Sequence, residues 1–318
     1  MSTDATVDEA AFSELAERYR PEMRVHCYRM LGSFEDSEDA VQETLLRAWR
    51  RRETFEGRST FRAWLYRIAT NACLDALGRR ERGLQVATGP EVPWLQPFPD
   101  HLLEEIPADE DEPDAAVVAK ETIELAFMTA IQHLPPRQRA VLILRDVLDW
   151  TAKDAAGLLG SSVASVNSAL QRARAAMKQH LPERRLEWGP GVDASKEEQA
   201  LLERYLNATQ DADAEAFIEM MREDARFSMP PEPGVWVGRR TIVESWSEAL
   251  DIESFGLVRG VVTRANTQPA LACYLKRPGQ DEYRPMALDV IRVEEGRVAE
   301  IVTFPPAVFP SFGLPAKL

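Results

Sequence analysis

The chain has 318 residues, long enough for two or three domains, and 45% of them are hydrophobic, which excludes a wholly disordered protein. Its formal net charge of −14 argues at first against a nucleic-acid partner. The charge is unevenly distributed, however. Acids and bases nearly cancel up to residue 80, acids dominate from 81 to 115, and bases exceed acids from 116 to 188. Nucleic-acid binding by the parts on either side of the acidic stretch is therefore not excluded.

Cys27, Cys73 and Cys273 are scattered, and no CxxC pair occurs. We therefore expect a reducing compartment, without a disulfide framework or a zinc site. The first twelve residues are acidic and lack the apolar core of a signal peptide, and no apolar run is long enough to span a membrane. We expect a cytoplasmic protein that needs no metal or other cofactor.

Two amphipathic helices are predicted first. Residues 8–31 carry apolar side chains at spacings of three and four, and Pro21 should kink or restart that helix. Ser33 can cap a second helix that extends to about residue 52, in which acids precede bases as the helix dipole favours. The second helix is either an ordinary surface helix or one whose polar face binds a protein partner.

The loop FEGRST at residues 55–60 leads into a third predicted helix, FRAWLYRIATNACLDALGRR. Thr60 can cap its start and Gly78 weakens its end. The helix either packs on a core or presents bases and aromatic rings to a nucleic acid. For Trp64 we favour the core, because it recurs at helical spacing with leucine and isoleucine.

Residues 83–113 are rich in proline and acid and show little helical period. Such a stretch is either a solvated tether or a functional segment. Trp94, Leu95 and Phe98 are apolar and prefer burial, so WLQPFPD is interpreted as an extended docking segment.

A second group of helices is predicted over residues 114–183. The last two form a helix-turn-helix pattern: Thr151 caps the first helix, Gly160 ends it, and Ser161 or Ser162 caps the longer helix that follows. The alternative is a helical hairpin with a solvated basic face.

After a glycine- and proline-containing linker at residues 184–195, helices are predicted over 195–213, 214–224 and 238–250. From residue 257 the period changes to that of strands, with a hairpin around Glu295 and Gly296. This final part, residues 196–318, is expected to be an α+β domain.

Three portions of the chain resemble known families. SEDAVQETLLRAW and FRAWLYRIATNACLDALGRR resemble region 2 of extracytoplasmic-function (ECF) sigma-70 factors, and HLPPRQRAVLILRDVLDW with LQRAR resembles region 4. YLNATQDADAEAFIEMMREDARFSMPPEPGVWVGRRTIVESW resembles the SnoaL-like branch of the NTF2-like cone fold. The expected protein is multidomain. It has two all-α sigma domains (residues 1–82 and 114–183) joined by the linker at 83–113, and a C-terminal α+β cone domain.

The resemblance implies an RNA polymerase sigma factor that directs promoter recognition and transcription initiation, not an enzyme. Its implied partners are core RNA polymerase, through the clamp helices of the largest subunit and the flap of the second-largest, and promoter DNA. The linker is implied to thread through polymerase near its active-site channel. The face implied to bind the clamp helices comprises Asp39, Gln42, Glu43 and Leu46.

Two sets of residues are implied to contact DNA. Those implied to hold the −10 element are Phe55, Arg58, Ser59, Arg62, Arg67, Asn71, Arg79 and Arg80. Those implied to face the −35 element from the recognition helix are Ala164, Ser165, Asn167, Ser168, Gln171, Arg172 and Arg174. Because the start of this helix carries no basic side chain, direct readout of bases is expected to be modest.

The cone fold usually encloses an apolar pocket. Its candidate lining residues are Met229, Trp236, Trp246, Tyr274 and Asp289, and for most of them we favour an ordinary core position over a pocket position. No histidine lies in this domain, so catalysis is not expected. We expect the domain to modulate the factor in cis by packing on the sigma domains or on the linker. The alternative is a small-molecule sensor, or a SnoaL-like isomerase or cyclase, coupled to DNA binding.

Overall fold

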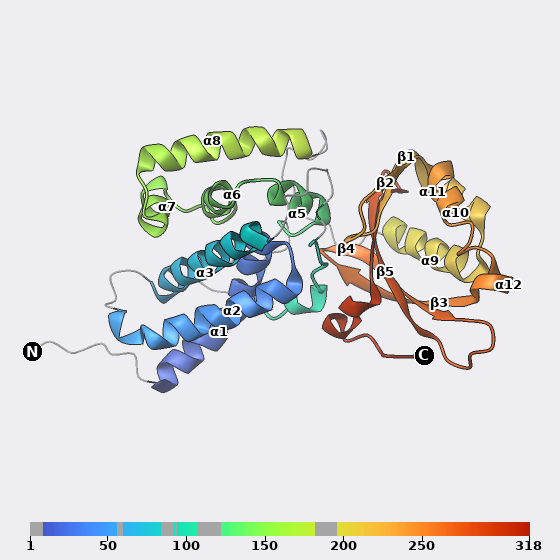
Figure 1. Ribbon diagram of the computed structural model, residues 1–318, viewed down its shortest axis with the longest axis horizontal. Coiled ribbons are helices and arrows are strands. Elements are labelled where there is room, and N and C mark those ends of the chain that lie inside the picture. The colour runs from blue at the N-terminus through green and yellow to red at the C-terminus, as the bar shows by residue number, and fades with distance from the viewer. Residues whose placement is uncertain (1–8, 56–59, 84–91, 93, 107–121, 182–195) are drawn as a thin grey trace, which may run out of the picture. The chain divides into compact units, whose positions relative to one another are not determined.

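The computed structural model describes residues 9–55, 60–83, 92, 94–106, 122–181 and 196–318. The chain divides into two compact units, whose helices and strands are labelled in Figure 1. The N-terminal unit comprises residues 1–88 and 102–190, and the C-terminal unit comprises residues 89–101 and 191–318. The whole predicted docking segment WLQPFPD therefore belongs with the C-terminal unit, although it precedes the second group of helices in sequence.

The N-terminal unit begins with three helices that pack on one another, α1 (Glu9–Leu31), α2 (Phe34–Arg50) and α3 (Phe61–Gly83). The short helix η1 (Arg52–Thr54) follows α2. Ser33 caps α2 by accepting a hydrogen bond from the Asp36 amide. Neither predicted interruption ends a helix: α1 contains Pro21, and α3 continues through Gly78. Their apolar stripes are buried between the three helices, which offsets the weak local propensity.

The second group of helices belongs to the same unit. It contains α5 (Leu125–Gln132), α6 (Pro136–Leu142), a π-helical turn η3 (Ile143–Val147), α7 (Ala152–Leu159) and α8 (Val163–His180). Helix α8 packs on α6 and α7. The helix predicted to begin near residue 114 is described only from residue 122, and its helical turns begin at Leu125.

The C-terminal unit is built on one sheet of six strands in the order β2-β1-β6-β5-β4-β3. Strands β1 and β6 are parallel, and the other neighbours are antiparallel. The bounds of the strands are β1 (Met221–Ser228), β2 (Val235–Val237), β3 (Leu257–Ala265), β4 (Gln268–Lys276), β5 (Arg284–Glu294) and β6 (Arg297–Phe304). Glu295 and Gly296 form the predicted hairpin, and both have positive φ.

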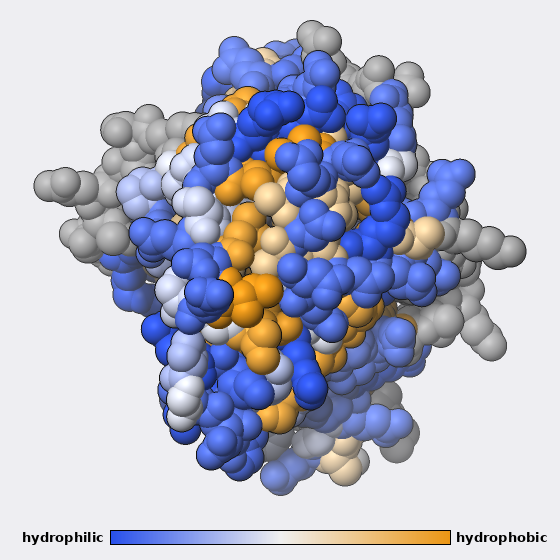
Figure 2. Space-filling view, turned by 90° about the vertical axis from the view of Figure 1, so that its right-hand side faces the viewer, coloured by the Kyte–Doolittle hydropathy of each residue, from blue (hydrophilic) through white to orange (hydrophobic). Residues whose placement is uncertain are grey.

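Helices accompany this sheet. They are α9 (Lys196–Asp211), α10 (Ala214–Met220), α11 (Arg239–Ser245) and α12 (Ile252–Phe255), with η5 (Pro306–Phe312) near the C-terminus. The short helix η2 (Asp100–Leu103) lies in the linker, where the division between the two units falls. Helix α9 packs on β3 and β4, and α11 packs on β1. Tyr205, Phe217, Met221 and Ile301 belong to the core between helices and sheet. Figure 2 shows hydrophobic side chains gathered among hydrophilic ones on the face that includes α12.

Two predicted helices in this unit are too long. The helix predicted over residues 214–224 ends at Met220, because Met221 begins a strand that pairs with β6. The helix predicted over residues 238–250 ends at Ser245. In the first case the strand pairing that ends the helix joins residues about 75 positions apart, so no local signal reveals it.

Among the described helices, none is long and apolar enough to cross a membrane. Within the same residues, no group of three histidine, cysteine or acidic side chains could hold a metal ion.

Candidate nucleic-acid interface, linker contact and C-terminal cavity

Local capping positions the helix-turn-helix of the N-terminal unit. Thr151 Oγ1 accepts a hydrogen bond from the Asp154 amide at 3.1 Å, which starts α7. Gly160 then adopts φ = 57°, a left-handed conformation that glycine tolerates at little cost. Ser162 Oγ accepts from the Ser165 amide at 3.1 Å and starts α8. The turn predicted from these residues is therefore present.

Helix α8 has one buried and one exposed side. Val166, Leu170, Ala173 and Met177 are buried against the neighbouring helices. The residues predicted to face the −35 element are all exposed: Ala164, Ser165, Asn167, Ser168, Gln171, Arg172 and Arg174. Arg174 also forms a two-bonded ion pair with Asp146 at 2.7 and 2.8 Å, which fixes its guanidinium beside η3.

The predicted −10 residues on α3 fall into two groups. Arg67, Asn71 and Arg79 are exposed. The Asn71 amide nitrogen donates to the Arg67 carbonyl oxygen at 2.9 Å, one helical turn away. These side chains are therefore accessible to a partner from solvent.

Arg62 and Arg80 are instead held within the unit. Arg62 Nε donates to Glu22 Oε1 at 2.7 Å, and the guanidinium lies 5.4 Å from the ring centre of Tyr66. Arg80 contacts the Asp36 carboxylate and donates to the Leu31 carbonyl oxygen at 3.2 Å. Both arginines thus fasten α3 to the helices before it.

Aromatic rings gather where the loop enters α3. The ring centre of Phe55 lies 5.7 Å from that of Phe61 and 5.4 Å from that of Trp64. Phe61 is buried, whereas Phe55 and Trp64 are half-buried. Arg58 and Ser59, the other loop residues predicted to contact DNA, lie outside the described residues.

The predicted polymerase-binding residues share one face of α2, as their spacing of three and four requires. Asp39, Gln42 and Leu46 are exposed, and Leu46 keeps 51% of its surface accessible. Glu43 accepts a hydrogen bond from Arg47 Nε at 2.7 Å. This face of α2 therefore presents one exposed apolar side chain among polar ones.

Buried polar side chains join the two groups of helices in the N-terminal unit. Gln132 Nε2 donates to the Arg29 carbonyl oxygen at 3.1 Å. The guanidinium of Arg139 is buried, donates to the carbonyl oxygens of Ile131 and Gln132, and reaches the carbonyl oxygen of Met30 at the end of α1. Removing a partner from such a buried set leaves other polar groups unsatisfied, which is costly.

The linker segment packs on the turn between β3 and β4. The Phe98 amide donates to Asn266 Oδ1 at 2.7 Å, and the Asn266 amide donates back to the Phe98 carbonyl oxygen at 2.9 Å. Pro99 pairs with Ala265 as an isolated antiparallel bridge at the end of the edge strand. The linker thus covers part of an edge that would otherwise present unpaired backbone groups.

Side chains on both sides of this contact reinforce it. Phe98 has no exposed surface and Leu95 is also buried. Asp100 accepts from the Thr267 amide at 2.9 Å and lies 3.4 Å from Arg264 Nε. Asn266 and Thr267 have φ of 55° and 61°, a region in which asparagine is one of the better tolerated residues. Trp94, the third predicted docking residue, is half-buried.

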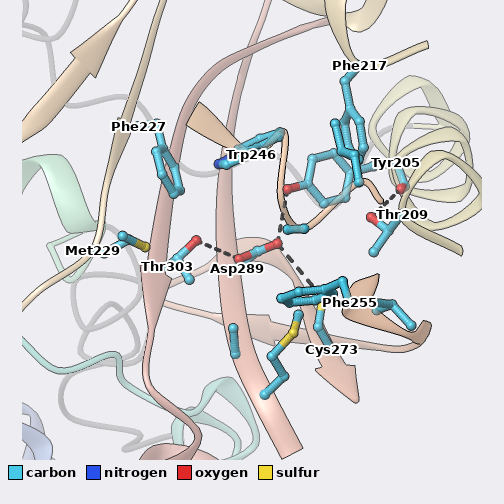
Figure 3. Close-up of a pocket in the computed structure, with 15 residues that line it drawn as sticks. Tyr205, Thr209, Phe217, Phe227, Met229, Trp246, Phe255, Cys273, Asp289 and Thr303 are labelled. Carbon is cyan, nitrogen blue, oxygen red and sulfur yellow. Dashed lines mark hydrogen bonds between the residues drawn. The ribbon is translucent and has the colours of Figure 1, made fainter. Parts of the chain in front are cut away.

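A cavity of about 270 Å³ lies within the C-terminal unit. Its wall is mostly apolar and includes the predicted Met229 and Trp246, together with Phe217, Phe227 and Phe255 (Figure 3).

Asp289, also predicted, lines the cavity, whereas two other predicted residues do not. Trp236 packs against Phe227, with ring centres 5.3 Å apart. Tyr274 is buried against Phe309 and donates to the Pro315 carbonyl oxygen at 2.9 Å.

Three side chains that sequence reasoning missed surround Asp289 (Figure 3). Tyr205 donates its hydroxyl proton to Asp289 Oδ2 at 3.0 Å, and Thr303 donates to Oδ1 at 2.6 Å. Cys273 Sγ lies 3.9 Å from Oδ2. Tyr205 comes from α9, and Thr303 stands opposite Asp289 in the register of β5 and β6. Once that register is known, it identifies Thr303 as a neighbour of Asp289.

The surroundings of Asp289 shift several pKa values. Burial raises the pKa of the Asp289 carboxyl above its ordinary value, although the hydrogen bonds from Thr303 and Tyr205 act in the opposite direction. Burial and the nearby carboxylate raise the pKa of the Tyr205 hydroxyl and of the Cys273 thiol. Tyrosine and cysteine therefore stay protonated at neutral pH and act as donors.

Comparison with known proteins matches both helical groups to one family. The family model for sigma-70 region 2 matches residues 15–83, and that for sigma-70 region 4 matches residues 124–177. The ECF RNA polymerase sigma factor SigG of Mycobacterium tuberculosis is 42% identical over 324 residues, covering 96% of this chain and 85% of its own length.

SigW of Bacillus subtilis, another ECF sigma factor, is 29% identical over 174 residues, which cover 55% of this chain and 90% of SigW. Among solved structures, the Mycobacterium tuberculosis ECF sigma factor SigJ has a TM-score of 0.62 at 24% identity. That match covers 96% of this chain and 99% of SigJ, and it supports the fold of both units.

Proposed function

The chain belongs to the ECF RNA polymerase sigma factors, and on that premise we propose which of its surfaces contact promoter DNA, core polymerase and its own linker. The observation that carries the proposal is the exposed side of α8, which follows a capped helix-turn-helix. This role requires no chemical step catalysed by the chain.

Helix α8 enters the major groove of the −35 element. Asn167 can form two hydrogen bonds with an adenine edge, and Arg172 can contact guanine or phosphate. Val163 at the start of the helix is 44% exposed and can contact a thymine methyl group. Few charged groups lie at this end, so affinity depends on contacts made elsewhere as well.

The loop before α3 and the exposed residues of that helix hold the −10 element. Arg67, Asn71 and Arg79 are accessible for phosphate or base contacts. The half-buried ring of Phe55, supported by Phe61, offers a surface on which an unstacked base can lie. Arg62 and Arg80 serve chiefly to hold α3 in place, because each already forms an ion pair.

Core polymerase binds through both helical groups. The face of α2 formed by Asp39, Gln42, Glu43 and Leu46 contacts the clamp helices of the largest subunit. The second helical group contacts the flap of the second-largest subunit. Exposure of Leu46 beside acidic groups supports the first assignment.

The packed N-terminal unit must open to engage a promoter. The two elements are roughly 25 base pairs apart, which is about 85 Å along DNA at about 3.4 Å per base pair. In this structure Gln132 and Arg139 hold the two helical groups together, so α3 and α8 are not about 85 Å apart. We therefore regard this structure as the resting form.

The C-terminal unit regulates the factor by holding the linker. In the bound state the linker would pass through polymerase, whereas here residues 94–100 are packed on the β3–β4 turn. The two positions are mutually exclusive, so docking of the linker on the C-terminal unit opposes polymerase binding. Weakening that contact should raise affinity for core polymerase.

Promoter recognition is tested by transcribing genomic DNA of the source organism with its core polymerase and the full-length chain. Sequencing of the transcript ends should reveal start sites that share −10 and −35 sequences and require the chain. Start sites unchanged from core polymerase alone would overturn the assignment of the DNA-binding surfaces.

A further inference from the structure

The C-terminal cavity combines one carboxylate with an otherwise apolar and aromatic wall. Its only acidic lining residue is Asp289, and no arginine, lysine or histidine of the described chain lines it. Among the residues that the structure describes, none forms an ion pair with Asp289. Asp289 lines the cavity and is half-buried as a residue.

The hydrogen bonds around Asp289 leave room for another donor. A carboxylate has about four acceptor positions. Here Tyr205 and Thr303 each occupy one, at 3.0 and 2.6 Å, and the Cys273 thiol is a weak third contact at 3.9 Å. The hydroxyl protons of Tyr205 and Thr303 already point to the carboxylate. These side chains and the Cys273 thiol therefore act toward a ligand as hydrogen-bond acceptors.

Filling the cavity changes the electrostatic balance. An apolar ligand that expelled water would leave the carboxylate with neutral partners only, which is unfavourable in a low-dielectric site. A ligand that brings a cationic N–H group replaces the lost water and compensates the charge. The net charge of −14 also attracts cations toward the chain.

We infer that this cavity binds a small apolar amine in its protonated form, with the ammonium group on Asp289 and the hydrocarbon part among Trp246, Phe227 and Met229. An engineered cavity of about 150 Å³ holds one benzene ring, so about 270 Å³ accommodates one or two rings with a short amine chain. None of the residues that line this site belongs to the proposed promoter surfaces or to the linker contact.

The test compares 2-phenylethylamine with 2-phenylethanol, which has nearly the same shape but no charge. Calorimetric titration of the full-length chain at pH 7.5 should give an affinity for the amine at least about tenfold higher, because both ligands can donate a hydrogen bond to Asp289 but only the ammonium group also compensates its charge. Equal binding of the alcohol would overturn the inference, and so would failure of the amine to bind.

Two variants and a pH series locate the contact. Asp289→Asn should lower amine affinity at least about tenfold and alcohol affinity much less, because only the amine loses a charge pairing as well as a hydrogen bond. Asp281→Asn, which neutralises an exposed carboxylate in the same unit, should leave both unchanged. Full amine affinity in Asp289→Asn would refute the assignment.

Acidification of the unmodified chain provides a second measurement that does not depend on the variant folding. Protonation of Asp289, which faces Tyr205, Cys273 and Thr303, should weaken amine binding much more than alcohol binding, because only the amine loses a charge pairing. A pH-independent amine affinity through the titration of this carboxyl would contradict the proposed contact.

Discussion

Phe98 anchors the linker to the C-terminal unit, and Phe98→Ala should release it. The ring is fully buried, and replacing a buried phenylalanine with alanine typically costs about 3–5 kcal/mol. The backbone bonds to Asn266 each contribute about 0.5–1.5 kcal/mol and persist only while the segment stays docked. A loss of about 3 kcal/mol increases the undocked population at least about a hundredfold.

Hydrogen exchange measures that population. The Asn266 amide donates to the Phe98 carbonyl oxygen, and the Thr267 amide donates to Asp100, so both are protected by docking. In Phe98→Ala, exchange of peptides covering residues 94–100 and 262–268 should accelerate about a hundredfold, up to the limit set by free exchange. Peptides from β5 and β6 should be unaffected.

Trp236→Ala is the matched control. It removes an aromatic ring from β2, at the opposite edge of the sheet from β3, and leaves the linker contact intact. If Phe98→Ala exchanged at the wild-type rate in both peptides, the linker would not be held by this ring. If Trp236→Ala accelerated the same peptides equally, the effect would reflect general destabilisation.

Three further outcomes are expected. Burial and Arg29 lower the pKa of His26 to about 3, against about 6.5 in the unfolded chain. The stabilisation that neutral His26 gives the folded state is therefore complete above pH 6.5 and declines as the pH falls toward 3. Between pH 7.5 and 5.5 this change should cost on the order of 1 kcal/mol of unfolding free energy. Urea titration should find that the loss is absent in His26→Gln, and equal losses in the two proteins would contradict the prediction. Gln132→Ala should accelerate hydrogen exchange near the end of α1 by removing the bond to the Arg29 carbonyl oxygen, and an unchanged rate would show that this bond does not hold the two helical groups together. Tyr205→Phe removes a hydrogen bond that lowers the pKa of Asp289, so 2-phenylethylamine affinity should begin to fall at a higher pH than in the wild type; coincident pH profiles would count against it.

Local chemistry predicted the helix-turn-helix well. Thr151, Gly160 and Ser162 act within three residues of themselves, so their capping roles are readable without tertiary contacts. The spacing on α2 and α8 likewise predicted which side chains share an exposed face. The end of α10 at Met220 was not predictable in this way, because β1 is defined by its distant partners β2 and β6.

The features that local sequence did not predict depend on contacts between residues far apart in the chain. Arg62 was expected on a DNA-binding face, and its pairing with Glu22, 40 residues earlier, has no signature in local sequence. Asp289 was predicted from its position in an apolar strand. Tyr205 and Thr303 join it only through the packing of α9 and the register of β5 with β6.

Promoter recognition by α8 is tested most directly by transcription from a mapped promoter with single base changes in its −35 element. Wild-type chain should discriminate against one or more changes by about 1–3 kcal/mol, roughly fivefold to 150-fold, and Asn167→Ala should lose discrimination at one position while still responding to −10 changes. Wild-type transcription that was indifferent to every −35 change would contradict the placement of α8 in the major groove.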